Sequence, residues 1–344
     1  MPSGPLLFGS DGRLPPSVLA TYRAAGCYRF TNVISPSELA ELRATVETLL
    51  ELVPSASGSE SNKLGLTARY TDHTDFMPSL GQDGEAGDDQ SPHEMRTYSP
   101  PPGMPAETLR VVSGWLRLAA DFPAFLRLYG HPQLLAIAAS ICGEDFVPSG
   151  GGESIQLMEP HIGSASAWHQ DGTSHYGSQW GELENEHGFN YMVQLYGSTP
   201  VNAVYAVPGS HRGGRADIGA LVSEHGERLE SHGAVPLLSN PGDVLITDRS
   251  ILHGSFPNRG PHRRYTIHHG FHCRAAVLSG ANPEYTPETV ARKAKAIELG
   301  IACRRAHFLN ELAFAYQPAN GAPPVGWDPD DADMMKPLAG TLRL

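Results

Sequence analysis

The chain has 344 residues, 40% of them hydrophobic, and a formal net charge of −12. That length is enough to bury a sizeable core, and we expect one domain over residues 1–344. The acidic balance disfavours nucleic acid as a partner. Neither a membrane-spanning apolar run nor a secretory leader is evident, so no membrane association and a cytoplasmic location are expected.

Cysteine usage agrees with that location. The four cysteines are widely spaced and form no CxxC pair; they are Cys27, Cys142, Cys273 and Cys303. Such spacing is typical of free thiols in a reducing compartment.

The first half of the chain has helical periodicity interrupted by one irregular segment. Apolar residues at helical spacing predict a helix over 36–52, with Ser35 as its N-cap. Residues 53–105 are rich in Ser, Gly and Pro and carry an excess of acids, which predicts a lid or flexible insertion. Helical patterns return at about 106–142.

A β region follows, over about 145–274. Its clearest predicted strands lie near 153–158, 189–196, 202–207, 243–247 and 264–272. A last helix is expected at 286–305, capped near Thr286. Helices followed by clustered strands predict a mainly β fold with flanking helices, whose core is a double-stranded β-helix, the cupin-like jelly roll.

Three residues within the β region form a candidate metal site. His169 and Asp171 are two apart, so on a strand they point to the same side. His253 would come from another strand that the fold brings alongside. Two imidazoles and one carboxylate on one face of a metal leave other positions open, which suits non-haem Fe(II). A structural hydrogen bond between His169 and Asp171 is the plain alternative for those two alone.

An arginine near the third histidine is a candidate anion clamp. Residues 256–261 are predicted to form a turn, and the strand that returns from it begins at Arg264. A hairpin there would bring Arg264 back near His253. The planar guanidinium binds a carboxylate through two hydrogen bonds. Arg263 is the competing candidate.

The order of these motifs resembles the phytanoyl-CoA dioxygenase (PhyH) family of Fe(II)- and 2-oxoglutarate-dependent oxygenases. The motifs are HxD at 169–171, PGSH at 208–211, HGS at 253–255, Asn258, and Arg264. The resemblance covers most of the chain. It implies that His169, Asp171 and His253 are the catalytic metal ligands and that the cofactors are Fe(II), 2-oxoglutarate and O2.

The resemblance also implies roles for residues around the metal. Arg264 would bind the far carboxylate of 2-oxoglutarate, with Ser255 as its helper. Tyr191 falls where the family often places a residue against the co-substrate. Gln156, on the strand entering the site, is a further candidate to touch the ligand. His268, His269 and His272 are better explained as strand residues on alternating faces than as a second metal cluster.

The expected function is oxidation of a small organic substrate, with hydroxylation first among the outcomes, in natural-product or other specialised metabolism. Two alternatives remain: a redox-inert metal enzyme of the cupin type, and a jelly roll that binds a ligand without catalysis. Arg264 at its family spacing argues against the first, and the intact metal triad argues against the second. A homodimer is an open alternative to a monomer.

Overall fold

The structure is a computed structural model of the chain. It describes residues 1–78, 107–148, 153–160, 168–171, 188–226, 228–256, 258, 260–279, 285–316, 326–328, 330–331 and 338.

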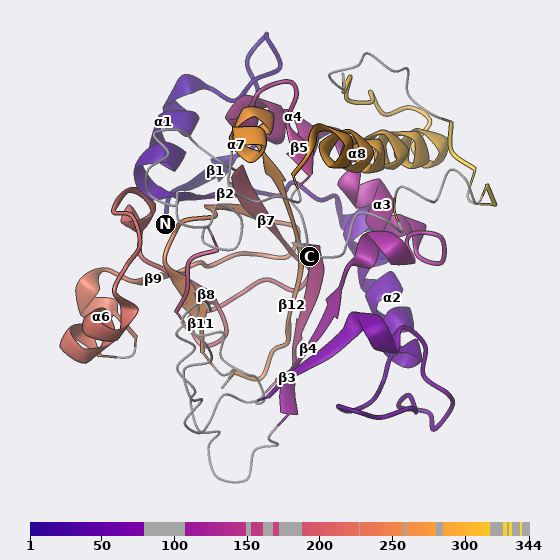
Figure 1. The fold of residues 1–344 in the computed structure, drawn as a ribbon, viewed down its shortest axis with the longest axis horizontal. Helices are drawn as coiled ribbons and strands as arrows, with labels where there is room; N and C mark the ends of the chain where they lie inside the picture. The colour runs from indigo at the N-terminus through magenta and orange to yellow at the C-terminus, as the bar shows by residue number, and fades with distance from the viewer. Residues whose placement is uncertain are drawn as a thin grey trace.

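A large, mostly antiparallel sheet forms the centre of the molecule (Figure 1). Its strands lie in the order β1 (Ser3–Pro5), β2 (Cys27–Thr31), β10 (Val244–Asp248), β7 (Gly188–Gln194), β12 (Arg264–His272), β6 (Ser154–Met158), β4 (Glu107–Ser113) and β3 (Thr74–Pro78). The short β5 (Val147–Pro148) pairs with the far end of β12. Only β1 and β2 run parallel among these pairs.

A smaller sheet packs against the inner face of the large one. It consists of β11 (His253–Ser255), β8 (Val204–Ala206) and β9 (Val235–Pro236). One apolar cluster joins the two sheets, with Met192 and Leu245 from the large sheet and Val204 and Ala206 from the small sheet. Two sheets that enclose a shared interior are the double-stranded β-helix that the sequence predicted.

Helices cover the outer face of the large sheet. They are α2 (Pro36–Leu52), α3 (Pro123–Tyr129), α4 (Pro132–Cys142) and α8 (Pro287–His307), with the 3-10 turn η2 (Trp115–Leu118) beside them. Their apolar residues form one cluster with Tyr191, Val193, Ile246 and Ile267 of the sheet. Because side chains alternate along a strand, the neighbours of these residues face the interior.

The remaining helices lie around this core. They are α1 (Pro16–Ala25), α6 (Ile218–His225), α7 (Arg274–Ser279) and the 3-10 turns η1 (Thr71–His73), η4 (Ser210–Arg212) and η5 (Glu230–His232). In Figure 1, α6 lies beyond the small sheet, away from α3 and α8. Among the described residues, no helix combines the length and apolar character that a membrane crossing requires.

The long helices begin where the sequence predicted. Ser35 caps α2 by accepting a hydrogen bond from the backbone N–H of Glu38, and Thr286 caps α8 in the same way with Thr289. A proline occupies the first turn of each helix, where its missing N–H costs nothing.

One expectation from the sequence was wrong, and the lid or insertion expected at 53–105 stays a prediction. The helical pattern assigned from about 106 begins instead with β4, which pairs with β6 and β3, so pairing within the sheet outweighs local preference. The predicted insertion at 53–105 contains η1 and β3, and its part from 79 onward lies outside the described residues.

The hairpin predicted between His253 and Arg264 is not what the structure has. The two strands that carry these residues lie in different sheets, since β11 pairs with β8 whereas β12 pairs with β6 and β7. The connection between them therefore crosses from the small sheet to the large one. Both residues nevertheless lie near His268 of β12.

Candidate metal centre and co-substrate site

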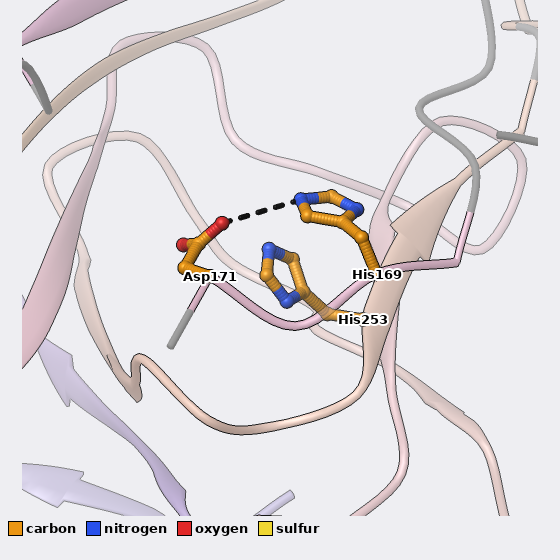
Figure 2. A group of neighbouring side chains, drawn as sticks. All are labelled: His169, Asp171 and His253. Atoms are coloured by element: carbon orange, nitrogen blue, oxygen red, sulfur yellow. Dashed lines mark ion pairs between the residues drawn. The ribbon is translucent and has the colours of Figure 1, made fainter. Parts of the chain in front are cut away.

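His169, Asp171 and His253 converge at one point of the interior, as Figure 2 shows. One nitrogen or oxygen atom from each lies within 4.8 Å of the other two. Two backbone hydrogen bonds join the segments: His169 N to His253 O at 2.8 Å and His253 N to His169 O at 3.0 Å. This isolated β-bridge brings the distant histidine beside the HxD segment.

Local hydrogen bonds orient the three side chains. His253 donates Nδ1–H to the carbonyl of Ile251 at 2.9 Å, which leaves Nε2 as the metal-facing nitrogen. Nε2 of His169 lies 3.5 Å from Oδ1 of Asp171. Gln170, between the two, is buried and donates to the carbonyl of Ser250 at 2.8 Å. This bond anchors the HxD segment to the loop before β11.

The second oxygen of Asp171 is held by Asn190 on β7, whose Nδ2 donates to Oδ2 at 2.7 Å. Arg249 Nη1 in turn donates to Asn190 Oδ1 at 2.8 Å. Sequence reasoning missed both residues. The sequence predicted a strand near 189–196, but no motif indicated which of its side chains would meet Asp171.

Arg264 is a buried cation in the same interior. Its side chain is 1% exposed, and Nη2 lies 3.7 Å from the sulfur of Met158. Nε and Nη1 have no hydrogen-bond partner among the described residues. Burial lowers the pKa of Arg264 to about 10. A guanidinium in such surroundings is strongly stabilised by an anionic partner, and a carboxylate matches its fork.

Arg263, the competing clamp candidate, faces the other way. It forms ion pairs with Glu47 and Glu159, and its guanidinium stacks on Tyr196 and Tyr265. Its side chain is 36% exposed. The register of β12 therefore leaves Arg264 alone of the pair facing the interior.

Gln156 and Ser255 lie near these groups. Gln156 is paired with Thr266 across β6 and β12, so it shares the inward face of Arg264 and is half-buried. Thr266 donates to Gln194 on β7 at 3.2 Å. Ser255 is buried and follows His253 by two residues on β11, which places both on one face.

Tyr191 is a correction to the candidate site. Its hydroxyl donates to the carbonyl of Leu134 in α4 at 2.6 Å, and its ring packs on His269 in the helix-covered core. Tyr191 therefore lies on the face of β7 opposite the metal centre, because a one-residue shift along a strand reverses the face. The side chain of the neighbouring residue, Asn190, faces the interior instead.

The adjacent histidines His268 and His269 of β12 face opposite sides of the sheet, as expected. His268 faces the interior, where burial and then the charge of Arg264 lower its pKa to about 3. Its Nε2 has no partner among the described residues. His269 lies between Trp115, Tyr129 and Tyr191 in the outer core. Within the part of the chain that the structure describes, His169, Asp171 and His253 alone form a three-residue group suited to a metal.

The donor set fits iron and a dicarboxylate co-substrate. Two neutral imidazole nitrogens and one carboxylate oxygen can share a cation while leaving coordination positions free. The guanidinium of Arg264 in the same interior can donate hydrogen bonds from Nε and Nη1 to the far carboxylate of a keto acid bound to that cation.

Fold and site together define an iron- and 2-oxoglutarate-dependent oxygenase, and a family comparison identifies the group within that class. The model of the family described as "Phytanoyl-CoA dioxygenase (PhyH)" matches residues 22–266. The chain belongs to the phytanoyl-CoA dioxygenase (PhyH) family. The cofactors of the class are Fe(II), 2-oxoglutarate and O2, as the sequence predicted.

Solved structures share the fold at low sequence identity. The carbocyclase SnoK from nogalamycin biosynthesis, a non-heme α-ketoglutarate-dependent enzyme, is 18% identical, with a TM-score of 0.52. The match covers 78% of this chain and 87% of SnoK. EctD from S. alaskensis, solved with 2-oxoglutarate and 5-hydroxyectoine, is also 18% identical, with a TM-score of 0.52, over 79% of this chain and 82% of EctD. A comparison with curated proteins found no match.

Proposed function

We propose that this protein oxidises a small organic molecule, by hydroxylation in the simplest case, at the centre formed by His169, Asp171 and His253. One observation supports this above the others. The buried guanidinium of Arg264, whose Nε and Nη1 have no hydrogen-bond partner among the described residues, shares the interior with a three-residue ligand set that leaves metal positions open. A metal site without a co-substrate needs no such cation.

The three ligands would hold Fe(II) through the ring nitrogens of His169 and His253 and one oxygen of Asp171. Bound together, iron, 2-oxoglutarate and O2 supply the oxidising chemistry of this class, and 2-oxoglutarate leaves as succinate and CO2. The role of the chain would be to position these groups. The bridge between His169 and His253 fixes the separation of two ligands before any metal binds.

Arg264 would hold the far carboxylate of 2-oxoglutarate, with Ser255 and Gln156 as polar neighbours. A charge-assisted hydrogen bond to a buried partner contributes roughly 1.5–3 kcal/mol. Because Nε and Nη1 have no described protein partner, the co-substrate would replace no existing ion pair there. Selection of a dicarboxylate follows from this chemistry.

A redox-inert cupin and a non-catalytic binding protein are the weaker candidates. Neither explains why Arg264, which is 1% exposed, has two guanidinium nitrogens without a hydrogen-bond partner in the part of the metal-bearing interior that the structure describes.

The substrate is proposed to be a small molecule of specialised metabolism. A carbocyclase from nogalamycin biosynthesis and EctD with 5-hydroxyectoine share this fold, and their chemistry differs. Because the fold does not determine the substrate, the substrates of these two enzymes are not proposed for this protein. The half-buried His268 and Gln156 offer polar atoms that could contact a substrate in the interior.

The test is substrate-dependent succinate formation. Protein loaded with Fe(II) is incubated with 2-oxoglutarate, O2 and small-molecule pools grouped by chemical class. A substrate should raise succinate above the substrate-free level and, for hydroxylation, give a product heavier by one oxygen atom. Asp171→Ala should abolish both signals, whereas the exposed-site control His232→Ala should retain them. Equal succinate from wild type and Asp171→Ala in every pool would contradict the proposal.

A further inference from the structure

The carboxylate of Asp171 is held on the side away from His169 by two residues in series, the half-buried Asn190 and the buried Arg249. Asn190 Nδ2 lies 2.7 Å from Asp171 Oδ2, and Arg249 Nη1 lies 2.8 Å from Asn190 Oδ1. Oδ1 of Asp171 is the oxygen nearer His169, at 3.5 Å. The contacts therefore distinguish the two carboxylate oxygens.

The chemistry of the three groups permits one orientation of the central amide. A guanidinium can only donate hydrogen bonds, and an ionised carboxylate can only accept them. The carbonyl oxygen of Asn190 must therefore face Arg249, and its NH2 group must face Asp171. Arg249 thus fixes the amide from behind, and the fixed amide presents its donor to the carboxylate.

The backbone of the neighbouring strand is shaped around this pair. A Cβ atom placed on Gly270 of β12 would lie 2.9 Å from Asn190 Oδ1 and 3.4 Å from Arg249 Nη1. It would also lie 2.5 Å from the carbonyl oxygen of Phe189. Gly270 is directly opposite Asn190 in the ladder, so a larger residue there would displace the amide.

Burial makes the pair energetically significant. Arg249 is 4% exposed, and Asn190 is half-buried beside the metal ligand. A buried cation lowers the energy of nearby negative charge much more than a surface cation does, because water screens it less. The Asn190 amide therefore holds Oδ2 of Asp171, while Oδ1 lies on the side of His169.

We propose that Asn190 and Arg249 are positioning residues for the metal centre: Arg249 fixes the Asn190 amide, which binds one oxygen of Asp171 and leaves the other for the metal. The inference rests on the proposed function, because it assumes that Asp171 is a metal ligand. Neither residue needs to touch the metal or the substrate. Loss of a group that orients a metal ligand typically weakens metal affinity 10- to 100-fold.

The experiment measures metal affinity apart from turnover. Metal-free protein is titrated with Co(II) under argon, and the visible Co(II) spectrum reports the ligand geometry. Asn190→Ala should weaken binding by about 10- to 100-fold and alter the spectrum. Met192→Leu, which changes the next inward residue of β7, should bind Co(II) like wild type. Thermal unfolding of each metal-free variant separates misfolding from a metal effect.

A double-mutant cycle tests the order of the chain. If Arg249 acts through Asn190, Arg249→Met should weaken Co(II) binding in the wild-type background and add little in the Asn190→Ala background. An effect of Arg249→Met that is equally large in both backgrounds would overturn the relay.

Affinity of Asn190→Ala within twofold of wild type, with an unchanged spectrum, would overturn the role of Asn190 even if its melting temperature fell. Failure of the proposed function gives a different result. In that case wild type and Asp171→Ala would bind Co(II) equally, whatever the Asn190 variants did.

Discussion

At the scale of single residues, Arg264 departs from what stability alone would select. A buried guanidinium with two nitrogens lacking described partners is costly to the folded protein, and burial lowers its pKa to about 10. Ligand-binding sites commonly contain residues that destabilise the folded protein but are needed for function. The interior of this jelly roll therefore favours the binding of an anion next to Arg264.

Replacement of Arg264 by Met should separate stability from binding. We expect Arg264→Met to weaken 2-oxoglutarate binding by tens- to hundreds-fold, since a charge-assisted contact contributes roughly 1.5–3 kcal/mol. The metal-free, ligand-free variant should be as stable as wild type or more stable. Calorimetric titration and urea unfolding measure the two effects.

Arg263→Met is the matched control for that experiment. Its guanidinium pairs with Glu47 on the outer side, so its loss should leave 2-oxoglutarate affinity nearly unchanged. A larger loss of affinity in Arg263→Met than in Arg264→Met would show that the inward register of β12 is wrong.

The sequence predicted the metal triad through motif spacing but misplaced one residue beside it. HxD, HGS and the arginine have a fixed order, and that order is visible in one dimension. Tyr191 was placed by counting along the chain, and an error of one residue reverses the face of a strand. Asn190 and Arg249 have no motif, because their contact depends on how β7 and the loop before β11 meet.

At the scale of elements, α2 and α8 are joined by a buried ion pair. Arg304 donates to both oxygens of Glu38, at 2.6 and 3.1 Å, and its Nε donates to Glu311 at 2.5 Å. Glu38 also lies in the first turn of α2, next to the cap formed by Ser35. The contact ties the first long helix to the last one across the outer face of the sheet.

Arg304→Ala should therefore destabilise the protein by about 3–5 kcal/mol, because Glu38 would remain buried without its partner. The exposed neighbour Arg305 provides the control, and Arg305→Ala should change stability by less than about 0.5 kcal/mol. Urea unfolding measures both variants. Equal stabilities of the two would show that the helices are held by apolar packing alone.

Elements with strong local signals were predictable and those that depend on partners were not. The helices α2 and α8 have capping residues and regular apolar spacing, so their starts were correct. The strand β4 was interpreted as part of a helix, because its pairing with β6 and β3 is not written in its own residues. The separation of β11 and β12 into two sheets was missed for the same reason, since it depends on which strands they pair with.

At the scale of the whole molecule, neutral histidines are built into the core. His269 packs among Trp115, Tyr129 and Tyr191, and burial lowers its pKa to about 3, with a smaller contribution from nearby His268. Burial also lowers the pKa of His131 well below its usual value. Below the ordinary histidine pKa of about 6.5, the unfolded chain binds protons that the folded protein cannot accept.

Stability should therefore fall as the pH decreases from about 6.5 towards 4. Each such histidine contributes up to about 1.4 kcal/mol per pH unit in that window. His269→Phe should reduce the slope of unfolding free energy against pH by the contribution of one histidine. His232→Gln, at an exposed position, should leave the slope unchanged. Unfolding free energies of the three proteins, measured from pH 7.5 to 5, test this prediction. Parallel curves for wild type and His269→Phe would contradict the buried, neutral state of His269.

The central claim is that His169, Asp171 and His253 together hold iron that a keto acid can chelate. Anaerobic titration of the metal-free protein with Fe(II) and 2-oxoglutarate tests it most directly. Wild type and His232→Ala should develop a weak visible charge-transfer band, and His169→Ala, Asp171→Ala and His253→Ala should each lose it. A band of wild-type intensity in all three ligand variants would contradict the account.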